Sequence, residues 1–153
     1  AIWCICLTDK SDKINKIIMK SIKKLLIPLF HIANLVMIIF YLYPGSIFGC
    51  FLYNNCAVQP KITSDIMISS NLFIASNHFF VFILLSILGV LGYGNTKKNK
   101  FLFVYLFLLS IILELLQIIV PVRAFEWSDL FGNILGVTLV IIIYKIKVKY
   151  VQN

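Results

Sequence analysis

Four apolar runs, each about as long as a helix that crosses a membrane, constrain the fold of this chain most strongly. A helix needs about 20 apolar residues to cross a hydrocarbon core, and the runs cover residues 25–43, 72–93, 101–122 and 127–144. Of the 153 residues, 61% are hydrophobic and 13% are charged, against about 25% charged in a typical soluble domain. We therefore predict an all-α membrane protein with about four transmembrane helices.

Basic residues flank these runs mainly on one side of the predicted membrane domain. They lie before the first run, between the second and third, and in the tail of residues 145–153, at Lys10, Lys13, Lys16, Lys20, Lys23, Lys24, Lys97, Lys98, Lys100, Lys145, Lys147 and Lys149. The opposite side has Lys61 and Arg123. The positive-inside rule then predicts that both termini are cytoplasmic. Because these residues can face lipid head groups, the net charge of +8 calls for no nucleic acid as a partner.

The predicted membrane domain covers residues 25–144 and follows a basic segment of residues 1–24. In that segment and at the first residue of the membrane domain, apolar residues recur at helical spacing with lysines between them, at Ile14, Ile17, Ile18, Ile22 and Leu25. This pattern fits an amphipathic helix that lies on the cytoplasmic membrane surface. It fits an extended or solvated basic anchor equally well.

The predicted outer loop, residues 44–71, contains Cys50 and Cys56. On the extracytoplasmic side such a pair can form a disulfide, and the alternative is two free thiols at the interface. The Cys and His residues show no spacing that is typical of a zinc site.

Polar residues inside the apolar runs are the main functional signal, because each is unfavourable in hydrocarbon unless it has a partner or a role. Ser110, Glu114 and Gln117 are four and then three residues apart, so they share one helical face. Asp129 and Asn133, in the fourth run, are also four residues apart. Two of the runs therefore carry a polar stripe.

The depths of these residues agree. At 1.5 Å per residue, one layer lies about 6 to 12 Å below the outer ends of the helices and contains His78, Glu114, Gln117 and Asn133. Arg123 and Asp129 lie nearer the mouth of that layer. This agreement predicts a polar pocket that opens toward the outer leaflet.

Three other groups of residues have structural interpretations. Gly132 and Gly136 form a GxxxG pair and, with Ser128, a small-residue stripe that favours close helix packing. His31 and Asn34 lie in the first run, where we interpret them as interhelical packing partners. Aromatic residues at the ends of the runs are typical of an interfacial belt, namely Tyr41, Tyr43, Tyr93 and Trp127.

Residues 114–136 read ELLQIIVPVRAFEWSDLFGNILG. This segment resembles the signature of the VanZ-like family of bacterial membrane proteins. The matching positions span a helix, a loop and the next helix, at Glu114, Gln117, Pro121, Arg123, Asp129, Asn133 and Gly136. The segment NHFFVFILLSILG, with His78, is similar to the family's His-aromatic segment, and YPG at 43–45 resembles the end of its first span. The resemblance covers residues 25–144. The family commonly has Asp-Lys shortly before the His, where this chain has Ile74 and Ala75.

The resemblance implies a multi-pass protein of the bacterial plasma (inner) membrane. Members of the family are associated with low-level resistance to teicoplanin-type glycopeptide antibiotics. Because a shared family does not fix a reaction, the function has to be argued from the predicted pocket.

A pocket in the outer half of the membrane suggests an enzyme that acts on a membrane lipid or on a lipid-linked cell-wall precursor. Its candidate catalytic residues are His78, Glu114 and Asp129. His78 could act as a general base or a nucleophile, and Glu114 could act as an acid or orient His78. The reaction class would be phosphodiester or head-group transfer, or hydrolysis.

The candidate substrate-binding residues are Gln117, Arg123 and Asn133. Arg123 could pair bidentately with a phosphate, while Gln117 and Asn133 would hold polar groups. A divalent cation near Asp129 could screen the phosphate.

A non-enzymatic role is the main alternative. The same polar side chains could satisfy one another as interhelical contacts, in a helix-bundle protein that binds or shields cell-wall precursors. A small transporter or an assembly partner is a further alternative, although the polar residues occupy one layer rather than lining a path. The sequence does not indicate an oligomeric state.

Overall fold

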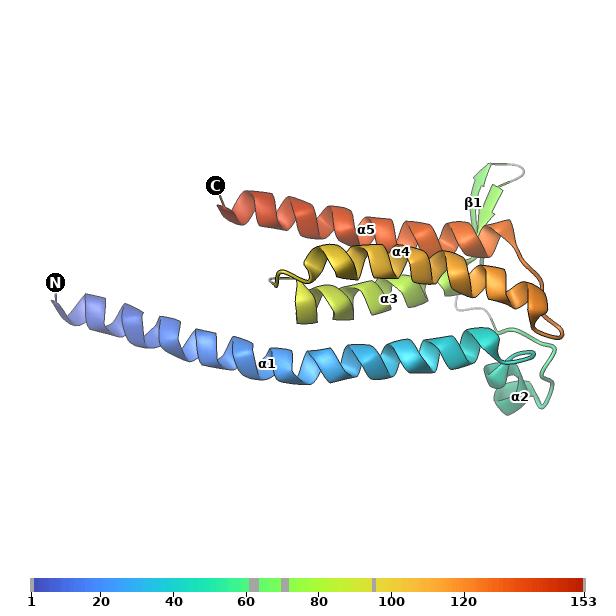
Figure 1. Ribbon diagram of the computed structural model, residues 1–153, viewed down its shortest axis with the longest axis horizontal. Coiled ribbons are helices and arrows are strands. Elements are labelled where there is room, and N and C mark those ends of the chain that lie inside the picture. Colours follow the sequence, from blue (N-terminus) through green and yellow to red (C-terminus); the bar gives the residue numbers. More distant parts are fainter. Residues whose placement is uncertain (1, 61–63, 70–71, 95, 153) are drawn as a thin grey trace.

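The computed structural model describes residues 2–60, 64–69, 72–94 and 96–152, and four long helices run alongside one another in it (Figure 1). These helices are α1 (Ile2–Leu42), α3 (Ser76–Tyr93), α4 (Asn99–Leu116) and α5 (Trp127–Gln152). Between α1 and α3 lie a short helix, α2 (Ile47–Tyr53), and a hairpin of strands β1 (Ile66–Ser69) and β2 (Leu72–Ile74). A single 3-10 turn, η1 (Gln117–Ile119), follows α4.

The four long helices confirm the predicted all-α membrane fold. Among the described residues, four segments are long and apolar enough to cross a membrane: 20–42, 76–93, 99–119 and 127–150. The second begins at Ser76 rather than at the predicted residue 72, because Leu72–Ile74 form a strand that pairs with β1. An apolar strand joined directly to an apolar helix has no boundary that hydropathy can detect.

α1 is one continuous helix, so the basic N-terminal segment runs into the first span without a break. α5 similarly continues through the basic tail to Gln152. Both termini lie at the same end of the bundle, and α2 and the hairpin lie at the other end (Figure 1). The position of the N-terminal segment on the membrane surface stays a prediction. Lys61 and the side chains of residues 1–19 lie outside the described part of the chain.

The tightest packing joins α3 to α5. A Cβ atom added at Gly132 would lie 2.9 Å from the Ala75 carbonyl oxygen, and one at Gly136 would lie 2.7 Å from the Phe79 carbonyl oxygen. Only glycine allows two helix backbones to approach this closely. The predicted role of the GxxxG pair in close packing is therefore confirmed.

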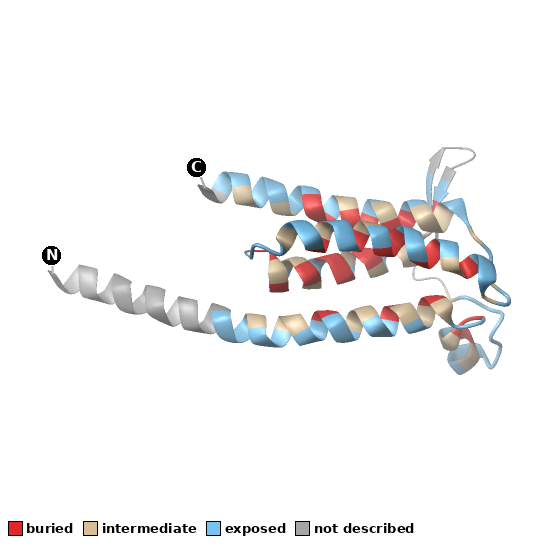
Figure 2. Ribbon diagram, viewed as in Figure 1, coloured by how far each residue is buried: buried red, intermediate tan, exposed pale blue. Residues whose placement is uncertain are grey.

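α1 packs more loosely than the other three spans. Only 17% of its spanning part is buried inside the bundle, against 33% for α5 and 39% for α3 and α4. Along that span the buried side chains appear as separate patches rather than a continuous stripe, at Phe30, Met37 and Tyr41 (Figure 2). Most of the surface of α1 is therefore available to lipid.

Two polar contacts tie the middle of α1 to the bundle. His31 Nε2 lies 2.8 Å from the Tyr93 hydroxyl of α3. Asn34 donates a hydrogen bond to the Tyr105 hydroxyl of α4. These contacts confirm that His31 and Asn34 are interhelical partners, and they give Tyr93 a role besides that of a belt residue.

The outer loop contains a disulfide between Cys50 and Cys56, whose Cα atoms are 4.1 Å apart. The bridge closes the loop around α2. The Ser46 hydroxyl caps this short helix by accepting a hydrogen bond from the Gly49 amide at 3.0 Å. Of the two alternatives for these cysteines, the structure has the disulfide.

Candidate functional site

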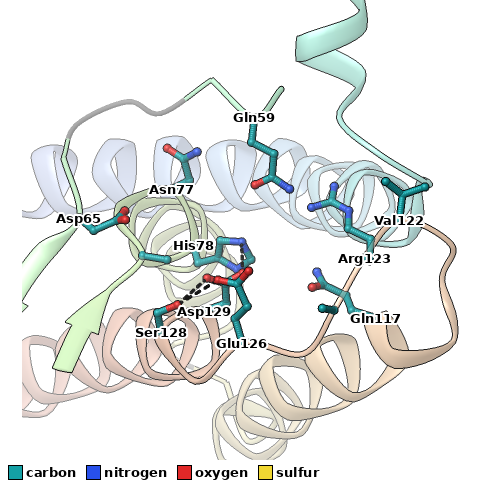
Figure 3. A pocket seen from close by; sticks show the side chains of 12 residues that line it. Gln59, Asp65, Asn77, His78, Gln117, Val122, Arg123, Glu126, Ser128 and Asp129 are labelled. Carbon is teal, nitrogen blue, oxygen red and sulfur yellow. Dashed lines mark hydrogen bonds and ion pairs between the residues drawn. The ribbon is translucent and has the colours of Figure 1, made fainter. Parts of the chain in front are cut away.

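The predicted polar residues gather at the end of the bundle opposite the termini, where α1 and α4 end and α3 and α5 begin (Figure 3). There they border a pocket of about 490 Å³. Its polar lining comes from three helical elements and two loops, and consists of Gln59, Asp65, Asn77, His78, Gln117, Arg123, Glu126, Ser128 and Asp129. The pocket is large enough for a small head group.

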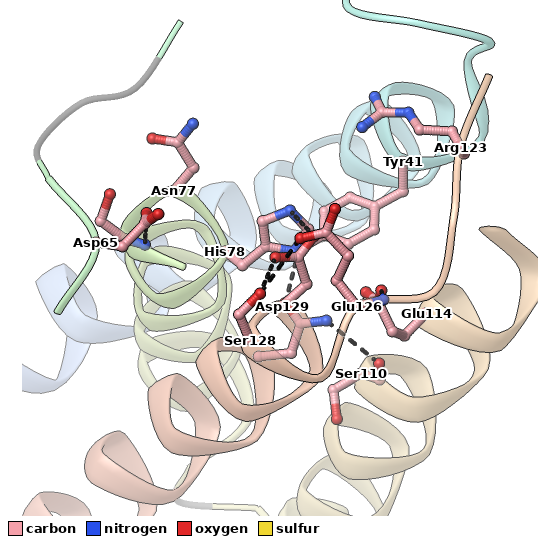
Figure 4. Close-up of polar contacts among 12 residues, drawn as sticks. Tyr41, Asp65, Asn77, His78, Ser110, Glu114, Arg123, Glu126, Ser128 and Asp129 are labelled. Carbon is pink, nitrogen blue, oxygen red and sulfur yellow. Dashed lines mark hydrogen bonds and ion pairs between the residues drawn. The ribbon is translucent and has the colours of Figure 1, made fainter. Parts of the chain in front are cut away.

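His78 lies at the centre of a chain of polar contacts that crosses the bundle (Figure 4). Its Nε2 atom lies 3.1 Å from Oδ2 of Asp129, and its Nδ1 atom lies 3.0 Å from the Tyr41 hydroxyl. Tyr41 donates to Oδ1 of Asn133 at 2.8 Å. Asn133 Nδ2 in turn donates to the Ser110 carbonyl at 3.4 Å. The chain therefore joins α1, α3, α4 and α5.

The donors and acceptors in this chain limit where the protons can lie. The amide nitrogen of Asn133 donates to a carbonyl, so its Oδ1 faces Tyr41 and accepts the single hydroxyl proton. The Tyr41 oxygen can then accept from Nδ1–H of His78. Nε2 and the Asp129 carboxylate can share a further proton, because two acceptors 3.1 Å apart would repel each other. The His78–Asp129 pair can therefore hold a proton that faces the pocket.

Glu114 is fully buried beside this pair. Its Oε1 accepts a hydrogen bond from the Glu126 amide at 3.1 Å, whereas its buried Oε2 has no hydrogen-bond partner among the described residues. One ligand atom each from His78, Glu114 and Asp129 lies within 4.8 Å of the others. One imidazole and two carboxylates at this spacing form a ligand set that could hold a divalent cation.

Arg123 lies in the loop between the third and fourth spans and points across the end of α1. It donates hydrogen bonds to the carbonyl oxygens of Tyr43 and Gly45. The preceding Val122 has a φ of 65°, an uncommon conformation for a β-branched residue, so the turn that directs Arg123 into the pocket is strained. Burial lowers the pKa of the Arg123 guanidinium, while the Asp129 carboxylate acts in the opposite direction.

The structure brings the six predicted site residues to one end of the bundle, but it changes the expected position of some. His78, Gln117, Arg123 and Asp129 line the pocket. Glu114 and Asn133 are fully buried and do not line it as far as the described residues define it. Asn133 accepts a hydrogen bond from Tyr41, and the carboxylate in contact with His78 is that of Asp129. The expected roles of Asn133 in substrate binding and of Glu114 as an acid or an orienting residue stay predictions.

Sequence reasoning missed Tyr41, which we interpreted as an interfacial residue. Its side chain is 7% exposed and contacts both His78 and Asn133. Its position near the outer end of the first run could have identified it as a site residue, since that position is close in depth to the predicted pocket. By contrast, Trp127 is 65% exposed, as expected of a belt residue.

Loop residues of the pocket were also missed. Asp65 accepts a hydrogen bond from the Ser76 amide at 3.5 Å, and Asn77 donates to the Pro60 carbonyl at 2.9 Å. These contacts fold the segment before α3 over the pocket, where Gln59 and Asp65 contribute to its wall. No periodic pattern in the sequence predicts such a fold of an irregular segment.

The fold and the site together define a polytopic membrane protein of four helical spans with a buried polar cluster at one end. The chain belongs to the VanZ/LLP1 family, whose model matches residues 6–148. The comparisons with curated proteins and with solved structures gave no match.

Proposed function

We propose that this protein modifies the head group of a membrane lipid, or of a lipid-linked cell-envelope precursor, by transfer or hydrolysis at a phosphodiester. The observation that carries this proposal is the His78–Asp129 pair, 3.1 Å apart, which lines the same pocket as Arg123. A proton donor and a guanidinium in one pocket meet the two needs of such a reaction, protonation of a leaving group and neutralisation of a phosphate. The teicoplanin link of relatives is compatible with such a substrate.

The polarity of the helices favours an anionic ligand. α3 begins at Ser76 and α5 begins at Trp127, so the amino ends of both helices lie at the pocket. The partial positive charge at a helix amino end attracts phosphate. The charged Arg123 adds to this attraction.

The proposed reaction uses one shared proton. The phosphate of the lipid lies against Arg123, and a hydroxyl group or water attacks phosphorus as the bond to the departing head-group oxygen breaks. The His78–Asp129 pair gives its proton to that departing oxygen and then takes the proton of the attacking group. The pair is thereby restored, and the phosphodiester has exchanged one alcohol for another or for water.

A divalent cation could bind between His78, Glu114 and Asp129, where it would take the place of the proton that His78 and Asp129 share. Oε2 of the buried Glu114 has no hydrogen-bond partner among the described residues, and it supports such a site because a buried carboxylate oxygen without a donor is unfavourable. The cation would neutralise phosphate charge. Calorimetric titration of the purified protein with Mn²⁺ should give saturable binding that Glu114→Gln weakens at least about tenfold. Equal binding by both forms would exclude Glu114 as a ligand.

The membrane orientation that we propose places the pocket in the outer half of the bacterial plasma membrane, with both termini in the cytoplasm. Two independent features support it. The basic residues concentrate at the other end of the bundle, and a disulfide at the pocket end suits an oxidising compartment. Alkaline phosphatase fused after Gln152 should be inactive, whereas activity there would reverse the orientation.

A non-enzymatic shielding or structural role is the competing function, and one observation favours it. The contacts from Tyr41 through His78 and Asn133 to Ser110 join four helices, as interhelical stabilising contacts would. Against it, Asp129 and Arg123 contribute to the wall of an open pocket rather than to the helix interfaces alone.

Mass-spectrometric lipid profiles of a bacterial host separate these two functions. Cells expressing the wild type should contain a lipid species that is missing from cells expressing Glu114→Gln at the same membrane level. Tyr93→Phe is the matched control, because it removes one interhelical hydroxyl contact far from the pocket and should leave that species unchanged. Identical profiles for wild type and Glu114→Gln, with both proteins folded, would favour shielding.

A further inference from the structure

A second hollow lies between α1 and α3 and has a different lining from the pocket. Its volume is about 620 Å³. Apolar side chains form most of its wall, namely Ala33, Val36, Met37, Phe40, Val81 and Leu84. Phe48 of α2 lines its end nearest the pocket. We call this hollow the α1–α3 groove. It runs along α1, the most loosely packed of the four described spans.

The groove adjoins the polar pocket. Five residues line both hollows: Gln59, Asn77, His78, Gln117 and Arg123. A molecule that extends from one to the other would therefore have a polar part beside Arg123 and an apolar part along α1. This division matches the two halves of a lipid.

The groove is open to the side. Val36 is 42% exposed and Leu84 is 62% exposed, and they lie on facing helices that border it. Beside them, Met37 is 5% exposed and belongs to the wall nearest the bundle core. A hydrocarbon chain could therefore enter from the membrane without leaving the apolar phase.

The length of the groove matches one leaflet. From Tyr41 to Ala33 the helix rises about 12 Å at 1.5 Å per residue, and one leaflet of a hydrocarbon core about 30 Å thick is about 15 Å deep. Below Ala33 the groove is closed, since Phe30 is buried and His31 contacts Tyr93. A closed end at this depth suits an acyl chain better than a polyprenyl chain long enough to cross both leaflets.

We propose that the α1–α3 groove binds one acyl chain of a glycerophospholipid whose phosphodiester lies in the polar pocket. This assignment rests on the proposed function and names its substrate class. The glycerol backbone would lie where the two hollows meet, beside Asn77 and Gln117. The phosphate would face Arg123, with the bond to the head group next to the His78–Asp129 pair.

Photo-crosslinking tests the position of the chain. The full-length protein is placed in nanodiscs with phosphatidylglycerol that carries a diazirine midway along one acyl chain, and labelled residues are identified by mass spectrometry. Labelling should concentrate on Val36, Met37 and Leu84. Ile39 is 52% exposed on the same helix and does not line the groove, so it reports the ordinary lipid shell. Equal labelling of Ile39 and the groove residues would overturn the proposal.

Filling the groove provides a second test. Val36→Trp should lower labelling of Met37 and Leu84 about tenfold, whereas Ile39→Trp should leave it unchanged. Leu84→Trp fills the groove from the facing helix and serves if Val36→Trp does not fold. Undiminished labelling in a folded groove variant would overturn the assignment. Stronger labelling by a diazirine polyprenyl phosphate would mean that the groove binds a polyprenyl chain rather than an acyl chain.

The outcomes separate this assignment from the proposed function. Glu114→Gln should keep the labelling of the groove while losing the lipid product. If wild type and Glu114→Gln gave identical lipid profiles but labelling stayed confined to the groove, the protein would be a lipid binder and the proposed reaction would fail alone. If the lipid product formed but labelling was not confined to the groove, the proposed reaction would stand and the groove would no longer be assigned as the acyl-chain site.

Discussion

Helix α3 packs against two of its neighbours, α5 and α1, in opposite ways. Toward α5, Gly132 and Gly136 bring the two backbones together until no added Cβ would fit. Toward α1, Val36 and Leu84 stand on either side of an open groove. Inside a membrane, apolar side chains gain nothing from leaving lipid, so close packing requires small residues or polar contacts. Where the chain has neither, a space remains that lipid can fill.

Among variants of the two α3 interfaces, the largest expected effect comes from adding a methyl group where α3 and α5 are closest. Gly136→Ala places a Cβ 2.7 Å from a backbone oxygen of α3 that cannot move aside, so the free energy of unfolding should fall by about 2 to 3 kcal/mol. Gly92→Ala is the control on the side of α3 that faces α1, where the nearest atom is 3.3 Å away on a flexible Ile27 side chain. Steric trapping in detergent measures both, and equal losses would contradict the contrast between the two interfaces.

Arg123→Gln should lower the free energy of unfolding by about 2 kcal/mol, because hydrogen bonds from a charged group are lost at the end of α1. Faster proteolysis of the loop after α1 should accompany the loss. Lys145→Gln removes the same charge at the other end of the bundle and should change neither property. A stability loss of the same size from Lys145→Gln would mean that net charge, rather than these contacts, is responsible.

Tyr41→Phe removes the side-chain hydrogen bonds that join α1 to His78 and Asn133. A hydrogen bond between membrane helices contributes about 0.6 kcal/mol on average, and the buried Asn133 oxygen loses its donor, so we expect a stability loss of about 1 kcal/mol. The lipid product should also fall. Tyr105→Phe removes the hydroxyl that contacts Asn34 and should cause a similar stability loss with no loss of product.

The smallest effect is expected in the groove wall. Leu84→Ala should change the free energy of unfolding by less than about 0.5 kcal/mol, because its side chain faces lipid. Leu85, the next residue, is 3% exposed, and Leu85→Ala should lower that free energy by about 2 to 4 kcal/mol. Thermal unfolding of both variants gives the comparison. A large loss from Leu84→Ala would mean that the groove is occupied by protein rather than by lipid.

The sequence predicted the spans because length and hydropathy alone determine which segments can cross a membrane. It also predicted that His78, Glu114, Gln117 and Asn133 share a layer with Asp129 near its mouth, since residues at similar depth on adjacent helices have few other positions. The roles within the cluster did not follow. Whether Glu114 or Asp129 contacts the imidazole depends on helix rotation, which packing decides, and depth carries no information about rotation.

The remaining misses have two physical causes. Tyr41 has the residue type and the position of an interfacial residue. Its hydroxyl is buried only because α3 and α5 pack against it, through His78 and Asn133. Asp65 and Gln59 reach the pocket through irregular backbone and a short hairpin, whose path is set by individual hydrogen bonds such as that from Asn77 to Pro60. The periodicity of apolar residues in the sequence cannot predict the course of such an irregular backbone.

The four-helix origin of the polar chain has a consequence for the biogenesis of the protein. Tyr41 and His78 belong to the first two spans, whereas Asp129 and Asn133 belong to the fourth, which is synthesised after them. Until α5 has been inserted, His78 lacks the carboxylate that shares its proton, and the pocket lacks one wall. On the proposed function, a nascent chain with only the first three of these helices inserted should be inert toward lipid, and activity should require insertion of α5.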